Sequence, residues 1–269
     1  MPSVTLHLLF ADRVLNALKE RGDPTPFDTR VPEIRNAFRQ GALGPDLGYF
    51  PGGHRFLSDL AHCVASADLT RTLVRGAKTA MERAFAWGWA THVLADQRLH
   101  PWIGRAVGQW RTGDPSKFVS GDEDPVGHVR IETGLDAWIS HQHGEVSRVP
   151  LRPFFDAASI QYLSLSYRRS YGVVLHPKIF LTSHEATTRM GRRALSAVRA
   201  MGRELAGAPA SIPLQVARGA LRGMTALRNR KDESHSVALA YLTPVRPETW
   251  LVEETEGEIE AFPRRFLDV

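Results

Sequence analysis

The chain has 269 residues, of which 43% are hydrophobic and 23% are charged, a composition typical of a globular protein with one large domain or two small ones. Its single cysteine, Cys63, excludes an intramolecular disulfide, and its net charge of +5 leaves room for a surface that meets phosphate. No stretch approaches the roughly 18 uninterrupted apolar residues of a membrane span, and the N-terminus lacks the pattern of an export signal. We therefore expect a cytoplasmic protein without a transmembrane segment.

Helical spacing dominates the N-terminal part of the sequence. The first predicted helix carries four apolar residues on one face: Leu6, Leu9, Val14 and Leu18. Residues 32–41 predict a short helix that stops at Gly41, and the Gly- and Pro-rich residues 44–53 predict a loop. Helical spacing then resumes over residues 58–76.

The most apolar predicted helix covers residues 80–100 and is expected to be central, with its end marked by Pro101. A polar loop is expected over residues 112–127, followed by a helix over 128–142. Three further helices are predicted, at 153–171, 178–206 and 213–229. No convincing run of alternating strand residues and no internal repeat is present, so we predict an all-α fold with a single multi-helix domain.

Charge is unevenly distributed along the C-terminal half. Ten Arg and Lys residues face one acid, Glu204, between Arg189 and Lys231, whereas six glutamates and no basic residue occur between Glu248 and Glu260. The two segments could neutralise each other, or the basic one could meet an anionic surface. The predicted helices of the basic segment have apolar stripes opposite arginines. This pattern favours helices that pack their apolar stripe on the core and expose their arginines to water, rather than helices that bind a membrane surface. The stripe residues are Met190, Leu195, Val198, Met201 and Leu205, then Leu214, Ala217, Leu221 and Met224.

Histidines and carboxylates recur at helical spacing in the apolar central helix. His92, Asp96 and His100 follow one another at i, i+4 and i+8, which places them on one helix face. His128 and Glu132 form another i, i+4 pair on the next predicted helix. An ionised carboxylate is costly to bury without a partner, and paired His and Asp or Glu side chains supply two metal ligands from one rigid element. Two such pairs predict a metal site rather than isolated hydrogen bonds.

Other polar residues are not assigned to this site. Cys63 is expected to be a small buried hydrophobe, and His141 and His143 are expected to be surface residues at a helix end. Three more histidines lack a carboxylate at helical spacing: His176, His184 and His235. The sequence has no phosphate-binding P-loop, no dinucleotide-binding G-x-G-x-x-G after a strand and no G-x-S-x-G elbow, which leaves nucleotide-cofactor and serine-hydrolase functions without support.

Four ordered motifs, HLLFADRVL, GALGPD, HVLADQRLH and HVRIE, resemble the zinc-dependent phospholipase C family. The branch that fits is that of unexported bacterial members, whose central helix reads H-x-x-x-D-x-x-x-H, and the fungal single-strand-specific zinc nucleases are more distant relatives. The likeness runs from His7 to about Trp138. It implies a zinc-cluster helical core over residues 1–150. Beyond the likeness, helical spacing and charge pattern predict further helices at 151–230 that would pack on this core, followed by an acidic C-terminal extension at 231–269.

The resemblance also implies two or three zinc ions and their ligands. The first zinc would be held by Asp46, His92, Asp96 and one of His54 or His62, with His62 preferred because the helix after it matches that of the family. The ligands of the second zinc would be His100, His128 and Glu132. The third would take His7 and the other oxygen of Asp96. In secreted members a processed N-terminal residue completes the third site, a role that would fall to Pro2 here if Met1 is removed.

By this resemblance the chain is expected to hydrolyse a phosphate ester, specifically a phosphodiester, with a hydroxide formed from a metal-bound water that Asp46 holds or deprotonates. A phospholipid headgroup is slightly preferred to single-stranded nucleic acid as substrate. The alternatives are a nuclease-like hydrolase and a non-catalytic helical protein in which zinc only stabilises the fold.

Overall fold

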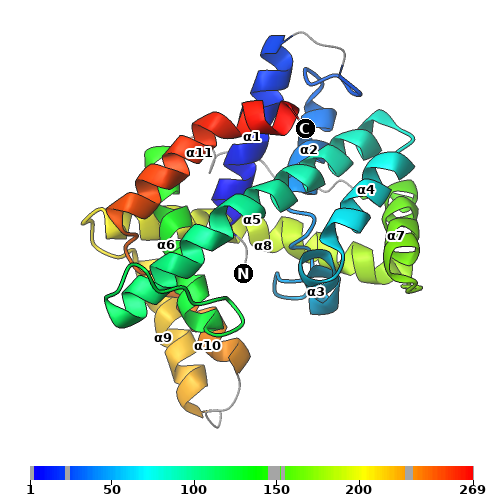
Figure 1. Cartoon of the computed structure of the whole chain (residues 1–269). Coiled ribbons are helices and arrows are strands. Elements are labelled where there is room, and N and C mark those ends of the chain that lie inside the picture. The colour runs from blue at the N-terminus through cyan, green and yellow to red at the C-terminus, as the bar shows by residue number, and fades with distance from the viewer. Residues whose placement is uncertain (1–2, 22–24, 145–151, 153–154, 228–232, 269) are drawn as a thin grey trace. The chain divides into compact units, whose positions relative to one another are not determined.

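The computed structural model describes residues 3–21, 25–144, 152, 155–227 and 233–268, with the side chains of 223–227 and 233–235 left out. Within these ranges the chain is helical and has no strand, which confirms the predicted all-α class (Figure 1). In chain order the helices are α1 (Val4–Arg21), α2 (Pro32–Ala42), α3 (Arg55–Cys63), α4 (Ser66–Gly76), α5 (Ala80–Thr112), α6 (Pro125–Gln142), α7 (Ala157–Tyr171), α8 (Pro177–Leu205), α9 (Ile212–Leu227), α10 (Glu233–Leu242) and α11 (Thr249–Leu267).

The chain forms two compact units built from interleaved segments. The first combines Met1–Leu6, Gln97–Val149 and Ala194–Glu258, and the second combines His7–Asp96, Pro150–Arg193 and Ile259–Val269. Helices α1, α5, α8 and α11 therefore contribute to both units. The division into a core at 1–150, packing helices at 151–230 and an extension at 231–269 stays a prediction.

In the second unit, two glycines allow α2 and α5 to cross at close range. A Cβ atom on Gly41 would lie 2.0 Å from the Phe85 carbonyl oxygen, and one on Gly88 would lie 1.9 Å from that of Phe38. Any side chain at either position would force the helices apart. Helix α2 ends at Ala42, one residue beyond the predicted stop at Gly41, and Gly41 also allows the close packing of the two helices.

Helix α7 anchors α3 and α4 through three tyrosine hydroxyl groups. Tyr167 and Tyr171 donate hydrogen bonds to the carbonyl oxygens of Leu57 and Leu60 in α3, at 2.9 Å each. Tyr162 donates to the carbonyl of Leu73 in α4, and α4 and α7 pack side by side. The buried aromatic rings contribute apolar contact while the hydroxyls satisfy polar atoms. Helix α7 therefore determines where α3 lies in this unit.

The prediction that the central helix ends at Pro101 is wrong, because α5 continues to Thr112 with the proline inside it. A proline removes one helical hydrogen bond and usually kinks or ends a helix. Beyond it, Gly104 and Gly108 contact Phe118 and Lys117 of the following loop, and the Val119 N–H donates to the Gly104 carbonyl. These loop contacts, which the periodicity of the helix does not reveal, support its second half.

The acidic C-terminal segment is helical where the structure describes it. In the first unit the Trp250 indole N–H donates to Gln109 Oε1 at 2.8 Å, and the Arg105 guanidinium lies 4.8 Å from the Trp250 ring centroid. Two of the six glutamates form ion pairs: Glu256 with His143 at 2.9 Å, and Glu258 with Arg98 at 3.9 Å. Among the helices described, none is both long and apolar enough to cross a membrane.

Candidate metal centre

Five predicted ligands converge in the second unit from four parts of the chain. Their positions are His7 on α1, Asp46 in the turn after α2, His62 in the last turn of α3, and His92 and Asp96 one turn apart on α5. His7, Asp46 and His92 are buried, while His62 and Asp96 are partly exposed. The Gly41–Phe85 crossing brings Ala42, and so the turn that holds Asp46, against the His92 ring.

Backbone carbonyls select the tautomers of the two central histidines. His62 Nδ1 lies 2.8 Å from the Ser58 carbonyl oxygen, and His92 Nδ1 lies 2.8 Å from that of Ala42. Since a carbonyl only accepts, each Nδ1 must donate its proton, and each neutral ring then has a lone pair on Nε2. The two Nε2 atoms are 3.1 Å apart. Two neutral rings would face each other with lone pairs, so this pair needs either a proton or a metal ion between the nitrogens. A fixed second nitrogen is the usual arrangement of a metal-binding histidine.

The carboxylates complete a set of donor atoms around these nitrogens. Asp96 Oδ2 lies 3.2 Å from His92 Nε2 and 3.5 Å from His62 Nε2, and Asp46 Oδ1 lies 3.4 Å from His62 Nε2. Ligands at about 2.1 Å from a tetrahedral zinc would be about 3.4 Å from one another. The observed separations fit such a shell, so the residues present suit a zinc ion.

Asp96 lies between two groups of donors. Its Oδ1 lies 3.3 Å from His7 Nε2 while its Oδ2 faces the Nε2 atoms of His62 and His92. The His7 and His92 rings stack with centroids 3.8 Å apart. In the described part of the chain, two sets of possible ligands have all donor atoms within 4.8 Å of one another: His7, His92 and Asp96; and Asp46, His62 and His92. His92 is common to both. A bridging role for Asp96 stays a prediction, and Pro2, the proposed completion of the third site, lies outside the described residues.

The charge balance of the group raises the pKa of His92. Burial alone would lower this pKa, because it disfavours the imidazolium, but the carboxylates of Asp96 and Asp46 and the carbonyl of Ala42 together raise it to about 9. Near neutral pH the metal-free protein therefore holds a proton at His92. Zinc must displace this proton to reach Nε2.

His54, the alternative to His62, is placed differently. It precedes α3 as the N-cap residue, its backbone N–H donates to Ser183 Oγ at 3.0 Å, and its ring packs edge-on against Phe56. It belongs to neither set of converging donors in the residues that the structure describes. The geometry supports the preference for His62, which remains a prediction about the metal-bound protein.

We expect His62→Ala to lower zinc affinity by about a hundredfold or more, because it removes one of about four donors of the shell. His54→Ala is the matched control and is expected to keep the zinc content of the wild type. The measurement is zinc per chain by elemental analysis after dialysis against a weak chelator. Loss of zinc in His54→Ala with retention in His62→Ala would reverse the assignment.

The three residues expected at the second zinc lie in the first unit. The His100 and His128 rings meet edge to face at 5.3 Å between centroids, and His128 Nε2 lies 3.6 Å from Glu132 Oε2. These three are not among the sets whose donor atoms all fall within 4.8 Å in the described chain. A zinc at this position stays a prediction, and it would need these side chains to draw closer.

Two neighbours of the group, Tyr49 and Ser58, are not among the predicted ligands. Tyr49 stacks on the His62 ring at 5.3 Å, and its hydroxyl donates to Asp59 Oδ1 at 3.1 Å. Ser58, whose carbonyl accepts from His62, lies one helical turn earlier, a signal available from spacing. Cys63 is exposed rather than buried, because it lies at the end of α3 on the side away from the packed face of Leu57 and Ala61.

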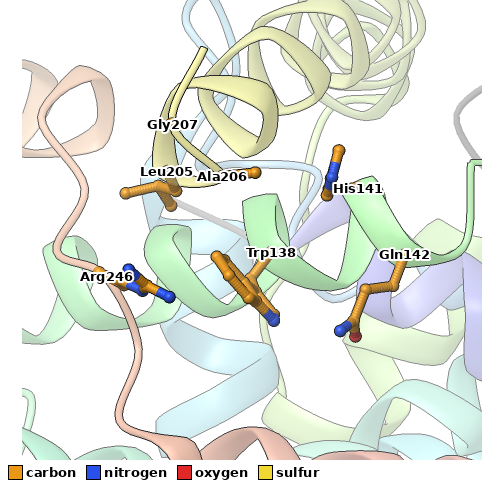
Figure 2. A pocket seen from close by; sticks show the side chains of 7 residues that line it. All are labelled: Trp138, His141, Gln142, Leu205, Ala206, Gly207 and Arg246. Atoms are coloured by element: carbon orange, nitrogen blue, oxygen red, sulfur yellow. The ribbon is translucent and has the colours of Figure 1, made fainter.

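A separate surface cavity of about 490 Å³ lies in the first unit beside the end of α6 (Figure 2). Its lining is Trp138, His141, Gln142, Leu205, Ala206, Gly207 and Arg246. His141 is exposed there, as predicted, whereas His143 at the same helix end is partly buried by its pair with Glu256. The lining contains no carboxylate beside its one histidine, so the cavity does not have the composition of a zinc site.

Comparison with known families supports the reading of the motifs. The sequence profile of the family described as zinc dependent phospholipase C matches residues 6–173, more than half of the chain. The match starts beside His7 and extends beyond Trp138 to include α7, the helix whose tyrosines anchor α3. No curated protein and no solved structure matches the chain.

Proposed function

Because the chain belongs to the zinc-dependent phospholipase C family, we propose that it hydrolyses a phosphodiester with zinc bound by His62, His92, Asp46 and Asp96, and a neighbouring ion at His7. The family relation supports a zinc-dependent hydrolase that acts on a phosphate ester. A phospholipid headgroup is the favoured substrate, and single-stranded nucleic acid is less favoured.

The observation that carries the proposal is the pair of histidines with Nε2 atoms 3.1 Å apart and both Nδ1 atoms committed to carbonyls. Two neutral rings of this tautomer would repel there, so the pair is suited to a cation between the nitrogens: a proton on His92 in the metal-free protein, and zinc in the proposed centre. The partial exposure of His62 and Asp96 supports access by a substrate to the same group.

Within this proposal Asp46 is the residue that handles the proton of the attacking water. Zinc supplies the polarisation that makes a bound water acidic near neutral pH and neutralises charge on phosphoryl oxygens. Asp46 is buried and its Oδ1 already lies 3.4 Å from His62 Nε2, so its carboxylate is held within the group that would orient the water. Buried carboxylates next to metal ligands are suited to accept such a proton.

The proposal is tested by parallel assays of three substrates: phosphatidylcholine vesicles, a short single-stranded DNA and bis-(p-nitrophenyl) phosphate. We expect chelator-sensitive turnover of the small diester and of the lipid, with a lower rate on DNA. Turnover of DNA alone would move the protein to the nuclease-like alternative. If the zinc-loaded protein turns over none of the three substrates, the proposal is refuted in favour of the alternative in which zinc only stabilises the helices.

A further inference from the structure

Helix α9 exposes apolar side chains on the face that points away from its own unit. Ile212 is 76% exposed and Val216 is 65% exposed, one turn apart along the helix. The next turn of the same face carries exposed Gly219 and Ala220, and a Cβ atom added to Gly219 would meet no heavy atom within 4 Å. Residues at i, i+4 and i+7 or i+8 share one face of a helix. We call these four residues the α9 outer face.

The opposite face of α9 holds the helix firmly to the unit. Leu214 is buried, and Arg218 donates to the carbonyl oxygen of Leu242 and to both carboxylate oxygens of Glu204. Helix α10 packs beside α9 and in turn contacts α6, which are neighbours in Figure 1. The prediction that the arginines of this helix lie opposite its apolar stripe is therefore wrong for Arg218, which lies on the packed side. Apolar side chains therefore occur on the outward side of α9 as well as on its packed side.

A surface helix that is apolar outward marks an interaction surface. The exposed Arg222 follows Gly219 by three residues and so lies beside the α9 outer face. In the sequence, no acidic residue occurs from Leu205 to Lys231. Two copies of such a face would bring positive charge against positive charge, whereas a bilayer with anionic headgroups offers both an apolar interior and opposite charge.

We propose that the α9 outer face docks the protein on an anionic phospholipid surface, with Ile212 and Val216 inserted below the headgroups and Arg222 at headgroup level. The docking surface lies outside residues 6–173, the part that matches the family. It goes beyond the proposed hydrolysis, because binding to a surface can be measured without turnover.

The test is co-sedimentation with vesicles of phosphatidylcholine containing a one-fifth share of phosphatidylserine, compared with vesicles of phosphatidylcholine alone. The wild type is expected to sediment with the anionic vesicles, and less so at high salt. The double variant Ile212→Gln, Val216→Gln is expected to bind at least about tenfold more weakly, because two apolar side chains no longer leave water. Arg222→Gln is expected to weaken binding about fivefold.

Matched controls come from equally exposed positions elsewhere. Val174→Gln replaces a valine that is 78% exposed on the turn before α8, and Arg168→Gln replaces an exposed arginine on α7. Both are expected to bind as the wild type does. Thermal unfolding of every variant, together with turnover of bis-(p-nitrophenyl) phosphate by the double variant at the wild-type rate, would show that the fold is intact.

Three results would overturn the docking proposal. The first is that the wild type does not bind anionic vesicles. The second is that the double variant binds them as tightly as the wild type does, which would place the membrane contact elsewhere on the protein. A dimer seen by analytical ultracentrifugation and lost in the double variant, without vesicle binding, would assign the α9 outer face to a second copy. Vesicle binding without turnover of any phosphodiester would instead refute the proposed function and leave the docking surface standing.

Discussion

Replacing His92 with alanine is expected to abolish zinc binding in the second unit and to lower kcat/KM for bis-(p-nitrophenyl) phosphate by at least about a thousandfold. His92 is the one residue common to both sets of converging donors. Its loss leaves Asp96 and Asp46 with less positive charge nearby and removes the nitrogen that faces His62. The measurement combines steady-state kinetics with elemental analysis of zinc.

The control for this substitution is His176→Ala. His176 is an exposed histidine whose Nδ1 accepts from the Lys178 backbone N–H, away from the donor group. It is expected to keep both activity and zinc. Because His92 is buried against Ala42, His92→Gln provides a second variant of similar size for use if the alanine variant unfolds. A folded His92 variant with zinc and full turnover would contradict the proposed centre.

Zinc affinity is expected to rise about tenfold for each pH unit up to about pH 9, so that two units below this pH it is about a hundredfold weaker. The metal-free protein binds a proton at His92, whose pKa is raised from 6.5 to about 9 by Asp96 and Asp46 against the effect of burial. The proton stabilises the metal-free fold. The stability that this proton gives the metal-free fold is complete below pH 6.5 and is lost as the pH rises through about 9. Over the same range zinc replaces the proton on His92 more readily.

Calorimetric titration with zinc in buffers of different ionisation enthalpy measures the protons released. About one proton per zinc is expected below pH 9. Asp46→Asn removes one of the two carboxylates that raise the pKa of His92, so its pH dependence should shift to lower pH. A zinc affinity that does not change with pH over this range would show that zinc binding does not displace a proton from His92.

Much of the helical architecture could be predicted from the sequence, because a packed helix repeats its apolar residues with a local period. The helices predicted near 80–100, 128–142, 153–171, 178–206 and 213–229 all appear, whereas α10 and α11 are not predicted. The errors occur where a distant contact overrides a local rule. Pro101 does not end α5 because Gly104 and Gly108 meet the loop at Lys117 and Phe118. Helix α2 ends within one residue of the predicted stop at Gly41, but the close packing of Gly41 against Phe85 is a distant contact that the local pattern does not contain.

The candidate site divides in the same way. The i, i+4 spacing of His92 and Asp96 places both on one helix face whatever else the chain does. The local sequence already favours His62 over His54 through the helix that follows it. The place of the His62 ring beside His92 also needs the position of α3, which depends on hydrogen bonds from Tyr167 and Tyr171 more than a hundred residues away.

The sequence by itself determined the helical class, the pairs of histidine and carboxylate on α5 and α6, and the family to which these motifs point, since each follows from residue types at short spacing. Only the tertiary structure decided that His7, Asp46 and His62 meet His92 and Asp96, that the carbonyls of Ser58 and Ala42 turn two Nε2 lone pairs toward each other, and that α9 exposes Ile212 and Val216. These depend on which helices pack together. Packing is set by the summed burial of many side chains across the chain, which no short segment encodes.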